Sequence, residues 1–146
     1  MATVKKLVLI EFTPRQMFEL VDRVEVYPQF LPWCGSTELL ERSDAITRAR
    51  LHINYHGIKA DFSTENDKLF PTHMLIKLVE GPFHHLEGMW DFTALGERAC
   101  KVEFSLHYEF SSKLIEKVVG PVFSHITNTL VDSFIKRAEQ VYARSV

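Results

Sequence analysis

The stretch that decides the fold is SSKLIEKVVGPVFSHITNTLVDSFIKRAEQVYA, residues 111–143. Apolar residues recur in it at every fourth position and form one row: Leu114, Val118, Val122, Ile126, Leu130, Phe134, Ala138 and Tyr142. A second row, with Thr127 as its gap, runs beside the first: Ile115, Val119, Phe123, Val131 and Ile135. Residues four apart lie on one helical face, so the pattern predicts an amphipathic helix about 45–50 Å long.

The spacing of this stripe also predicts what covers it. Four residues exceed one turn by about 40°, so the stripe winds around the helix and needs a curved partner. Gly120-Pro121 interrupts the run, and proline inside a helix removes a hydrogen bond. We therefore expect a kink there, or a break after which Pro121 restarts the helix. The whole pattern predicts one long helix held by a bent sheet, with an apolar pocket between them.

Composition and charge limit the class of protein. The chain has 146 residues, 46% hydrophobic and 25% charged, which predicts a single domain over residues 1–146. Eleven Phe, four Tyr and two Trp supply bulky lining for a core or a cavity. The net charge is -2 and the 17 basic residues are scattered, so no basic stripe predicts direct binding to DNA.

The cysteines and the N-terminus indicate a compartment. Cys34 and Cys100 lie far apart and outside any metal-ligand spacing, which is typical of reduced thiols in a cytosolic protein. The apolar run at residues 7–10 is too short for a signal core or a membrane span. We expect a cytoplasmic protein whose contact with the inner membrane, if any, is peripheral.

The rest of the chain predicts strands around two short helical segments. Residues 4–12 are typical of a first strand, and Thr13-Pro14 predicts a helix start, continuing to about residue 24. Two prolines in residues 26–34 limit that segment to a short helical turn and a loop. Six strands then follow: 37–43, 46–55, 58–67, 73–80, 83–94 and 98–110. Their alternation and short connections predict an antiparallel meander, hence an α+β fold.

Several motifs resemble a known family over essentially the whole chain. The order of elements resembles the helix-grip fold of START-like lipid-binding domains, in which a curved antiparallel sheet wraps around a long C-terminal helix. The motifs resemble the coenzyme Q-binding START-like family of the polyketide cyclase/START superfamily. They are Tyr27-Pro28-Gln29-Phe30-Leu31-Pro32 with Cys34, Val79-Glu80-Gly81-Pro82-Phe83, Gly88-x-Trp90-x-Phe92, Tyr108-Glu109-Phe110-x-x-Lys113-Leu114-Ile115 and Phe134-x-x-Arg137-Ala138-x-x-Val141-Tyr142. The Gly120-Pro121 pair departs from the family pattern.

The resemblance implies two activities, neither of them enzymatic. One branch of the family is described as binding ubiquinone in an apolar cavity and supporting respiration. Another branch, the ribosome association toxins, is described as binding the large ribosomal subunit and blocking subunit association, which inhibits translation. We take ligand binding as the first hypothesis and ribosome binding as the alternative. No cofactor is required by either, and ubiquinone is the candidate ligand.

The candidate binding residues come from the aromatic segment, the inward strand faces and the long helix. On the residues alone, a packed core explains this apolar set more simply than a cavity does. The resemblance implies a cavity, and Tyr55 or Tyr108 could then donate a hydrogen bond to a quinone head. The candidate ligand-binding residues are Tyr27, Phe30, Leu31, Trp33, Ile53, Tyr55, Phe62, Trp90, Phe92, Phe104, Leu106, Tyr108, Val122, Phe123, Ile126 and Leu130.

Metal binding and catalysis are not favoured by the sequence. His52 and His56 fall on one predicted strand face, whereas His84 and His85 are adjacent and therefore point to opposite faces. No carboxylate or cysteine spacing completes a set of metal ligands around either pair. Asp61 and Asp91 alternate with apolar residues and are expected to face solvent. No Ser-His-Asp or paired-carboxylate signature is visible, so we expect a non-catalytic protein without a metal.

Overall fold

The computed structural model describes residues 2–142. Within this range the elements follow in the predicted order of strand, helix, short helix, strands and long helix. They are β1 (Ala2–Ile10), α1 (Pro14–Asp22), the 3-10 helix η1 (Val24–Gln29), β2 (Cys34–Arg42), β3 (Ile46–Tyr55), β4 (Ile58–Leu69), β5 (His73–Glu80), β6 (Phe83–Ala94), β7 (Cys100–Phe110) and α2 (Lys113–Tyr142).

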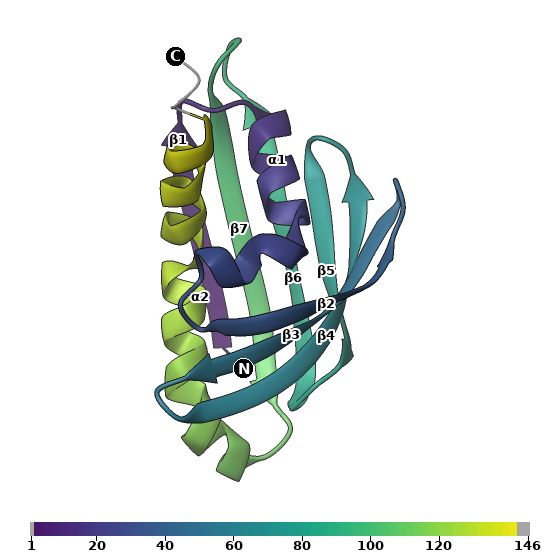
Figure 1. Ribbon diagram of the computed structural model, residues 1–146, viewed down its shortest axis with the longest axis vertical. Coiled ribbons are helices and arrows are strands. Elements are labelled where there is room, and N and C mark those ends of the chain that lie inside the picture. The colour runs from purple at the N-terminus through teal and green to yellow at the C-terminus, as the bar shows by residue number, and fades with distance from the viewer. Residues whose placement is uncertain (1, 143–146) are drawn as a thin grey trace.

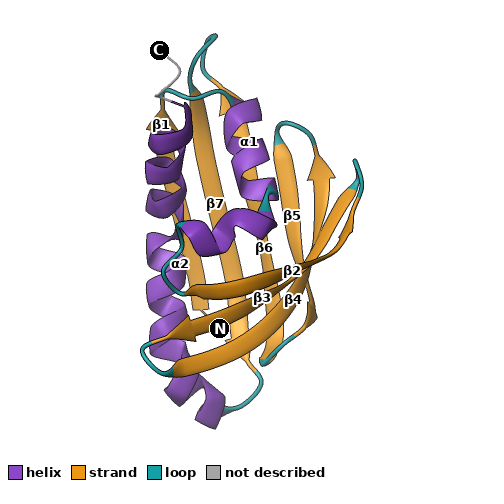
Figure 2. Cartoon of the chain, in the orientation of Figure 1, coloured by secondary structure: helices purple, strands orange, loops and turns teal. Residues whose placement is uncertain are grey.

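The strands form one antiparallel sheet in the order β1-β7-β6-β5-β4-β3-β2. Strands β2 to β7 are a meander, and β1 pairs beside β7, so the predicted α+β class and meander are confirmed. The sheet bends strongly, because β2, β3 and β4 cross the molecule at a steep angle to β6 and β7 (Figure 1). All the helices lie on its concave side (Figure 2). The sheet therefore wraps around α2, as the helix-grip resemblance implied.

The long helix shows one of the two outcomes expected at Gly120-Pro121. It is one continuous helix with Pro121 inside it, so a break with a restart does not occur. Its first turns bend away from the axis of the remainder, which fits the predicted kink (Figure 1). The predicted end at Ala143 lies outside the described residues.

The buried face of α2 lies on the two predicted rows but begins after their first members. Leu114 and Val118, at the start of that row, are 73% and 49% exposed. The buried residues of α2 all belong to the two predicted rows: Ile126, Phe134 and Ala138 to the first, and Val119, Phe123, Thr127 and Val131 to the second. Because both rows have a spacing of four, the buried face turns around the helix axis along its length, as expected. The apolar residues outside that face are left in solvent.

The N-terminal helix begins where its sequence predicts. Thr13 caps α1 in a capping box, in which its hydroxyl accepts from the Gln16 N–H and the Gln16 side chain accepts from the Thr13 N–H. Pro14 takes the first helical position. The buried face of α1 is Met17, Phe18, Leu20 and Val21. This face seals one end of the space between α2 and the sheet.

Candidate functional site

A cavity of about 100 Å³ lies between α2, the first helices and the concave face of the sheet. Its wall is drawn from α1, η1, β3, β4, β5, β6, β7 and α2 and contains no charged side chain. The predicted site residues on this wall are Tyr27, Trp33, Phe62, Trp90, Phe104, Leu106, Phe123, Ile126 and Leu130. That these residues bind a ligand remains a prediction.

The other predicted site residues lie off this wall. Leu31, Ile53, Phe92 and Tyr108 are buried in the core around the cavity. Phe30 packs on Phe134 and under the Arg137 guanidinium, and Val122 is partly buried against the core. Tyr55 stacks on His125, with ring centroids 5.6 Å apart. Neither tyrosine suggested for a quinone head therefore reaches the cavity wall.

The remaining wall residues were missed by the sequence reasoning: Val21, Val24, Ala49, Leu51, Thr64, Asn66, Ile76, Leu86, Thr127 and Phe134. A usable signal existed for Thr64 and Asn66. They lie two and four residues after Phe62 on β4, and alternate residues of a strand share a face. Polar side chains on an otherwise apolar inward face are the exceptions that identify a site.

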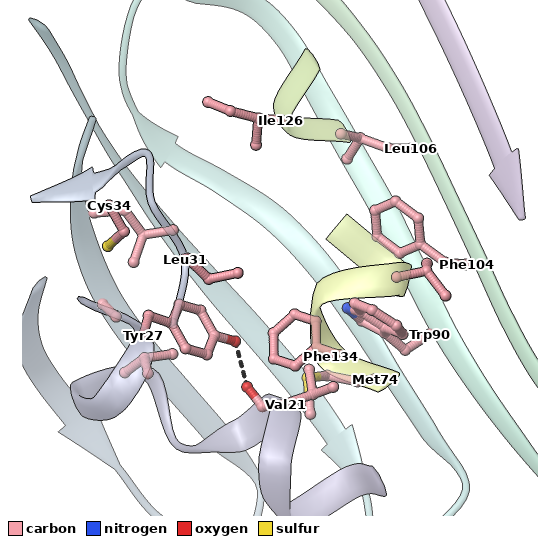
Figure 3. Packing of buried hydrophobic residues seen from close by; sticks show 14 of the residues in the cluster. Val21, Tyr27, Leu31, Cys34, Met74, Trp90, Phe104, Leu106, Ile126 and Phe134 are labelled. Atoms are coloured by element: carbon pink, nitrogen blue, oxygen red, sulfur yellow. Dashed lines mark hydrogen bonds between the residues drawn. The ribbon is translucent and has the colours of Figure 1, made fainter. Parts of the chain in front are cut away.

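An aromatic cluster forms one end of the cavity. The Phe134 ring lies 5.4 Å from Tyr27, 5.4 Å from Phe30 and 5.5 Å from Trp90, measured between centroids. Tyr27 and Trp90 flank Phe134, and the Tyr27 hydroxyl donates to the Val21 carbonyl (Figure 3). Burial raises the pKa of Tyr27, so this phenol stays protonated and its proton is held by the carbonyl. The aromatic segment thus closes the core at this end.

The size of the cavity limits what it holds in this conformation. Sites for drug-sized ligands measure about 300–1,000 Å³, and an engineered cavity of about 150 Å³ holds one benzene ring. The present space therefore suits a group about the size of one ring. A long isoprenoid tail needs the walls to move apart.

The histidine–aspartate pairs of the sheet lie on its opposite, convex face. Asp61 contacts His52 and Asp91 contacts His73, so both carboxylates point away from the cavity as expected. His56 lies in the turn after β3, beyond the strand face that it was expected to share with His52. Within residues 2–142 no group of three His, Cys, Asp or Glu residues is placed to hold a metal ion. Cys34 and Cys100 are buried, and burial raises the pKa of each thiol to about 11.

A curved antiparallel sheet that grips a long terminal helix over an apolar cavity defines a START-like protein. Comparison with known proteins agrees. The chain belongs to the family described as polyketide cyclase / dehydrase and lipid transport, whose model matches residues 10–135. The resemblance stated from the motifs is therefore confirmed at the level of family and fold.

The similar curated relatives carry two kinds of name. The ribosome association toxin RatA of Vibrio cholerae is 43% identical over 97% of this chain and 99% of its own length. RatA of Escherichia coli K12 is 38% identical over 98% of this chain and 90% of its own length. The mitochondrial coenzyme Q-binding protein COQ10 homolog B of Xenopus laevis is 28% identical over 93% of this chain and 57% of its own length.

Solved structures support the fold. A START superfamily protein from Mycobacterium smegmatis superposes with a TM-score of 0.75 at 21% identity, covering 95% of this chain and 98% of that one. The Zhui aromatase/cyclase from Streptomyces sp. R1128 superposes with a TM-score of 0.76 at 17% identity, covering 95% of this chain and 94% of that one. At these identities the likeness extends to the fold alone. Among the described residues, no helix has the length and apolarity needed to cross a bilayer.

Proposed function

We propose that this protein is a ribosome association factor of the RatA kind, which binds the large ribosomal subunit and prevents the small subunit from joining it. The observation that carries the proposal is the 43% identity, over nearly the full length of both chains, with a relative named for that activity. This was the alternative hypothesis from the sequence, and the names of the more similar relatives support it over ligand binding.

The electrostatics of the surface indicate how such binding works. Some basic side chains are paired with carboxylates, as in Arg42–Glu25 at 2.7 Å and Lys77–Asp67 at 2.7 Å. A chain with net charge -2 and scattered basic residues gains little from displacing counterions around ribosomal RNA. Contacts with the ribosome therefore depend on shape and on ribosomal protein surfaces more than on phosphate charge.

The test is a subunit-joining assay. Purified bacterial subunits are mixed under conditions that favour joining, with and without the protein, and separated on a sucrose gradient. The proposal predicts fewer assembled ribosomes and protein in the large-subunit fractions. An unrelated protein of similar size and charge is the control. A gradient profile unchanged by excess protein would contradict the proposal.

The second candidate function is binding of a hydrophobic small molecule in the cavity, with ubiquinone the ligand first predicted. The observation that favours it is an uncharged, largely aromatic cavity in a family whose description includes lipid transport. Burying apolar groups there gains about 0.8 kcal/mol per CH₂. Native mass spectrometry of freshly purified protein tests it: a bound lipid or quinone supports it. Ligand-free protein that also takes up no hydrophobic probe would refute it.

Neither function requires catalysis, and we propose that the protein is not an enzyme. The cavity wall offers no carboxylate, histidine or lysine to act as general acid or base. Its phenol at Tyr27 is tied to a backbone carbonyl. Ribosome binding places the protein in the cytoplasm, and a lipid ligand is compatible with peripheral contact at the inner membrane.

The two functions can be separated with one variant. Ala49→Leu replaces a methyl group on the cavity wall, at a residue 2% exposed, with an isobutyl group. We expect it to abolish uptake of small hydrophobic probes while leaving the outer surface intact. Ribosome binding that survives Ala49→Leu shows that the two sites are independent. If the variant is folded by circular dichroism but has lost both probe uptake and ribosome binding, ligand occupancy controls ribosome binding.

A further inference from the structure

The two edge strands of the sheet are protected to different degrees. Strands β1 and β2 end the strand order, so within the described residues each has a neighbouring strand on one side only. The register of β2 against β3 is interrupted at two places, and η1 packs beside β2, with Arg42 bonded to Glu25 at 2.7 Å. Strand β1 pairs with β7 over its whole length without an interruption. Because bulges and covering segments hinder pairing at an edge, β1 is the edge open to another strand.

The convex face of β1 carries two exposed leucines between opposite charges. Leu7 and Leu9 are 58% and 67% exposed, whereas Val8 between them packs against the core. Alternate residues of a strand share a face, so Lys5 lies on the same side as the leucines. Glu11, the next residue at this spacing, follows directly after the strand. Along this face the order is therefore cation, leucine, leucine, carboxylate, which is complementary to its own reverse.

A second copy of β1 running antiparallel matches this order in one register. Directly opposite residues of an antiparallel pair point to the same face and contact each other. When Val8 lies opposite Val8 of the second copy, Leu7 of each chain lies opposite Leu9 of the other. Lys5 of each chain then lies opposite Glu11 of the other, at the ends of the paired strands. Both exposed leucines gain apolar neighbours, and both charges gain opposite ones.

The other registers match less well. Registers centred on Lys5 or Lys6 place two ammonium groups directly opposite each other, which destabilises a strand pair. A register centred on Leu7 pairs that leucine with itself but places Lys5 opposite Leu9. Registers centred beyond Val8 leave fewer residues of β1 to pair. The lysines that protect this edge from indiscriminate pairing therefore also select the register centred on Val8.

We propose that two copies of this chain associate through β1, antiparallel and centred on Val8, so that the two sheets continue into one. On the concave side Lys6 lies opposite Ile10 of the second copy, and the aliphatic part of the lysine covers that residue. A contact confined to residues 6–10 and their flanking charges is smaller than a standard interface of about 1,600 Å², so the dimer is reversible. This inference is independent of both proposed functions, because it uses neither the cavity nor the ribosome.

Sedimentation equilibrium of the whole protein tests whether the dimer forms. The concentration runs from about 10 μM to about 1 mM, the range in which a contact of this size associates. The average mass should rise from that of one chain towards that of two and stop there, because a two-fold contact uses the β1 edge of both chains. A mass that stays at that of one chain, or rises past that of two, would overturn the proposal.

Two matched variants test which edge is used. Leu7→Lys places a charge opposite a leucine twice in each dimer and should raise the dissociation constant at least about tenfold. Leu40→Lys makes the same change at a leucine 48% exposed on β2 and should leave the constant unchanged. Both side chains are exposed, so both variants should fold, which circular dichroism checks. The reverse result would assign the contact to β2 and contradict the proposal.

A charge exchange tests the register. Lys5→Glu places two pairs of carboxylates opposite each other, and Glu11→Lys places two pairs of ammonium groups there. Each change alone should raise the dissociation constant by about threefold to tenfold, and less in high salt. The two changes together should restore the wild-type constant to within about twofold, because the ion pairs form again in reverse. If the single changes have no effect, or the double change fails to restore association, the register centred on Val8 is wrong.

Discussion

The convex and concave faces of β3 and β4 carry polar side chains of different kinds. On the convex face, Arg48 pairs with Glu65 at 2.5 Å, and His52 contacts Asp61 at 2.5 Å. On the concave face, Asn66 is one of the residues around an aromatic cavity, and its side-chain oxygen is buried without a hydrogen-bond partner among the described residues. The exposed pairs are screened by water and contribute little to stability, whereas the buried amide oxygen costs stability because it has no hydrogen-bond partner. Substitutions on the two faces of the same strands should therefore change stability by different amounts.

The largest effect is expected where the concave face meets the helix. Phe134→Ala removes a ring that is 1% exposed and contacts Tyr27, Phe30 and Trp90. We expect the free energy of unfolding, measured by urea denaturation, to fall by about 3–5 kcal/mol. Leu114→Ala, on the same helix but 73% exposed, is the control and should change it by less than about 0.5 kcal/mol. Equal losses in the two variants would mean that α2 is not gripped as described.

The second prediction is a gain in stability, and it concerns Asn66 on the concave face. Asn66→Leu replaces the unpaired amide with an apolar group of similar size, and it should raise the free energy of unfolding by about 1 kcal/mol when no ligand is present. The reason is that the folded protein no longer buries an unsatisfied acceptor. Denaturation of wild type and variant in parallel measures the difference. A clear destabilisation would show that the amide is already satisfied in the free protein.

A smaller effect is expected on the convex face. Glu65→Gln removes the charge that contacts Arg48 at 2.5 Å and Lys77 at 3.5 Å, with side chains 39% and 45% exposed on the basic partners. Exposed pairs of this kind contribute about 0–1 kcal/mol, so the loss of stability should not exceed about 1 kcal/mol and should shrink in high salt. A loss as large as that of Phe134→Ala would reverse the comparison between the faces.

The smallest expected effect is a dependence of stability on pH that comes from His52. The hydrogen bonds that the His52 ring donates to the carboxylates of Asp61 and then Glu38 raise the pKa of His52 above its usual value. A histidine whose pKa is higher in the folded protein than in the unfolded chain stabilises the fold fully at pH below the pKa of the unfolded chain. This stabilisation is lost as the pH rises through the pKa of the folded protein. His52→Asn should therefore lower stability more at pH 5 than at pH 8. NMR titration of the His52 ring should give a pKa above about 6.5, and a value below it would contradict the geometry.

The strands could be predicted closely because their signals are local. Strands β3, β5 and β6 begin and end where alternation and turn residues predict, at His56-Gly57 and Gly81-Pro82 for example. The two rows on α2 could be predicted, but the exposure of Leu114 and Val118 could not, because an apolar row in sequence does not show how far the partner extends. Asn66 was missed because burial of an isolated polar residue depends on register between β4 and its neighbours. Alternation along β4 does put Asn66 on the same face as Phe62. That this face borders a cavity depends on the bend of the sheet, which the alternation does not reveal.

Binding to the large ribosomal subunit is the central functional claim, and co-sedimentation with isolated subunits tests it most directly. The protein is pelleted with large subunits alone and with small subunits alone, at low and at moderate salt. The account predicts recovery with the large subunit only, with a shallow decrease as salt rises because the chain has a net charge of -2 and scattered basic residues. Equal recovery with both subunits, or binding that disappears at moderate salt, would contradict it.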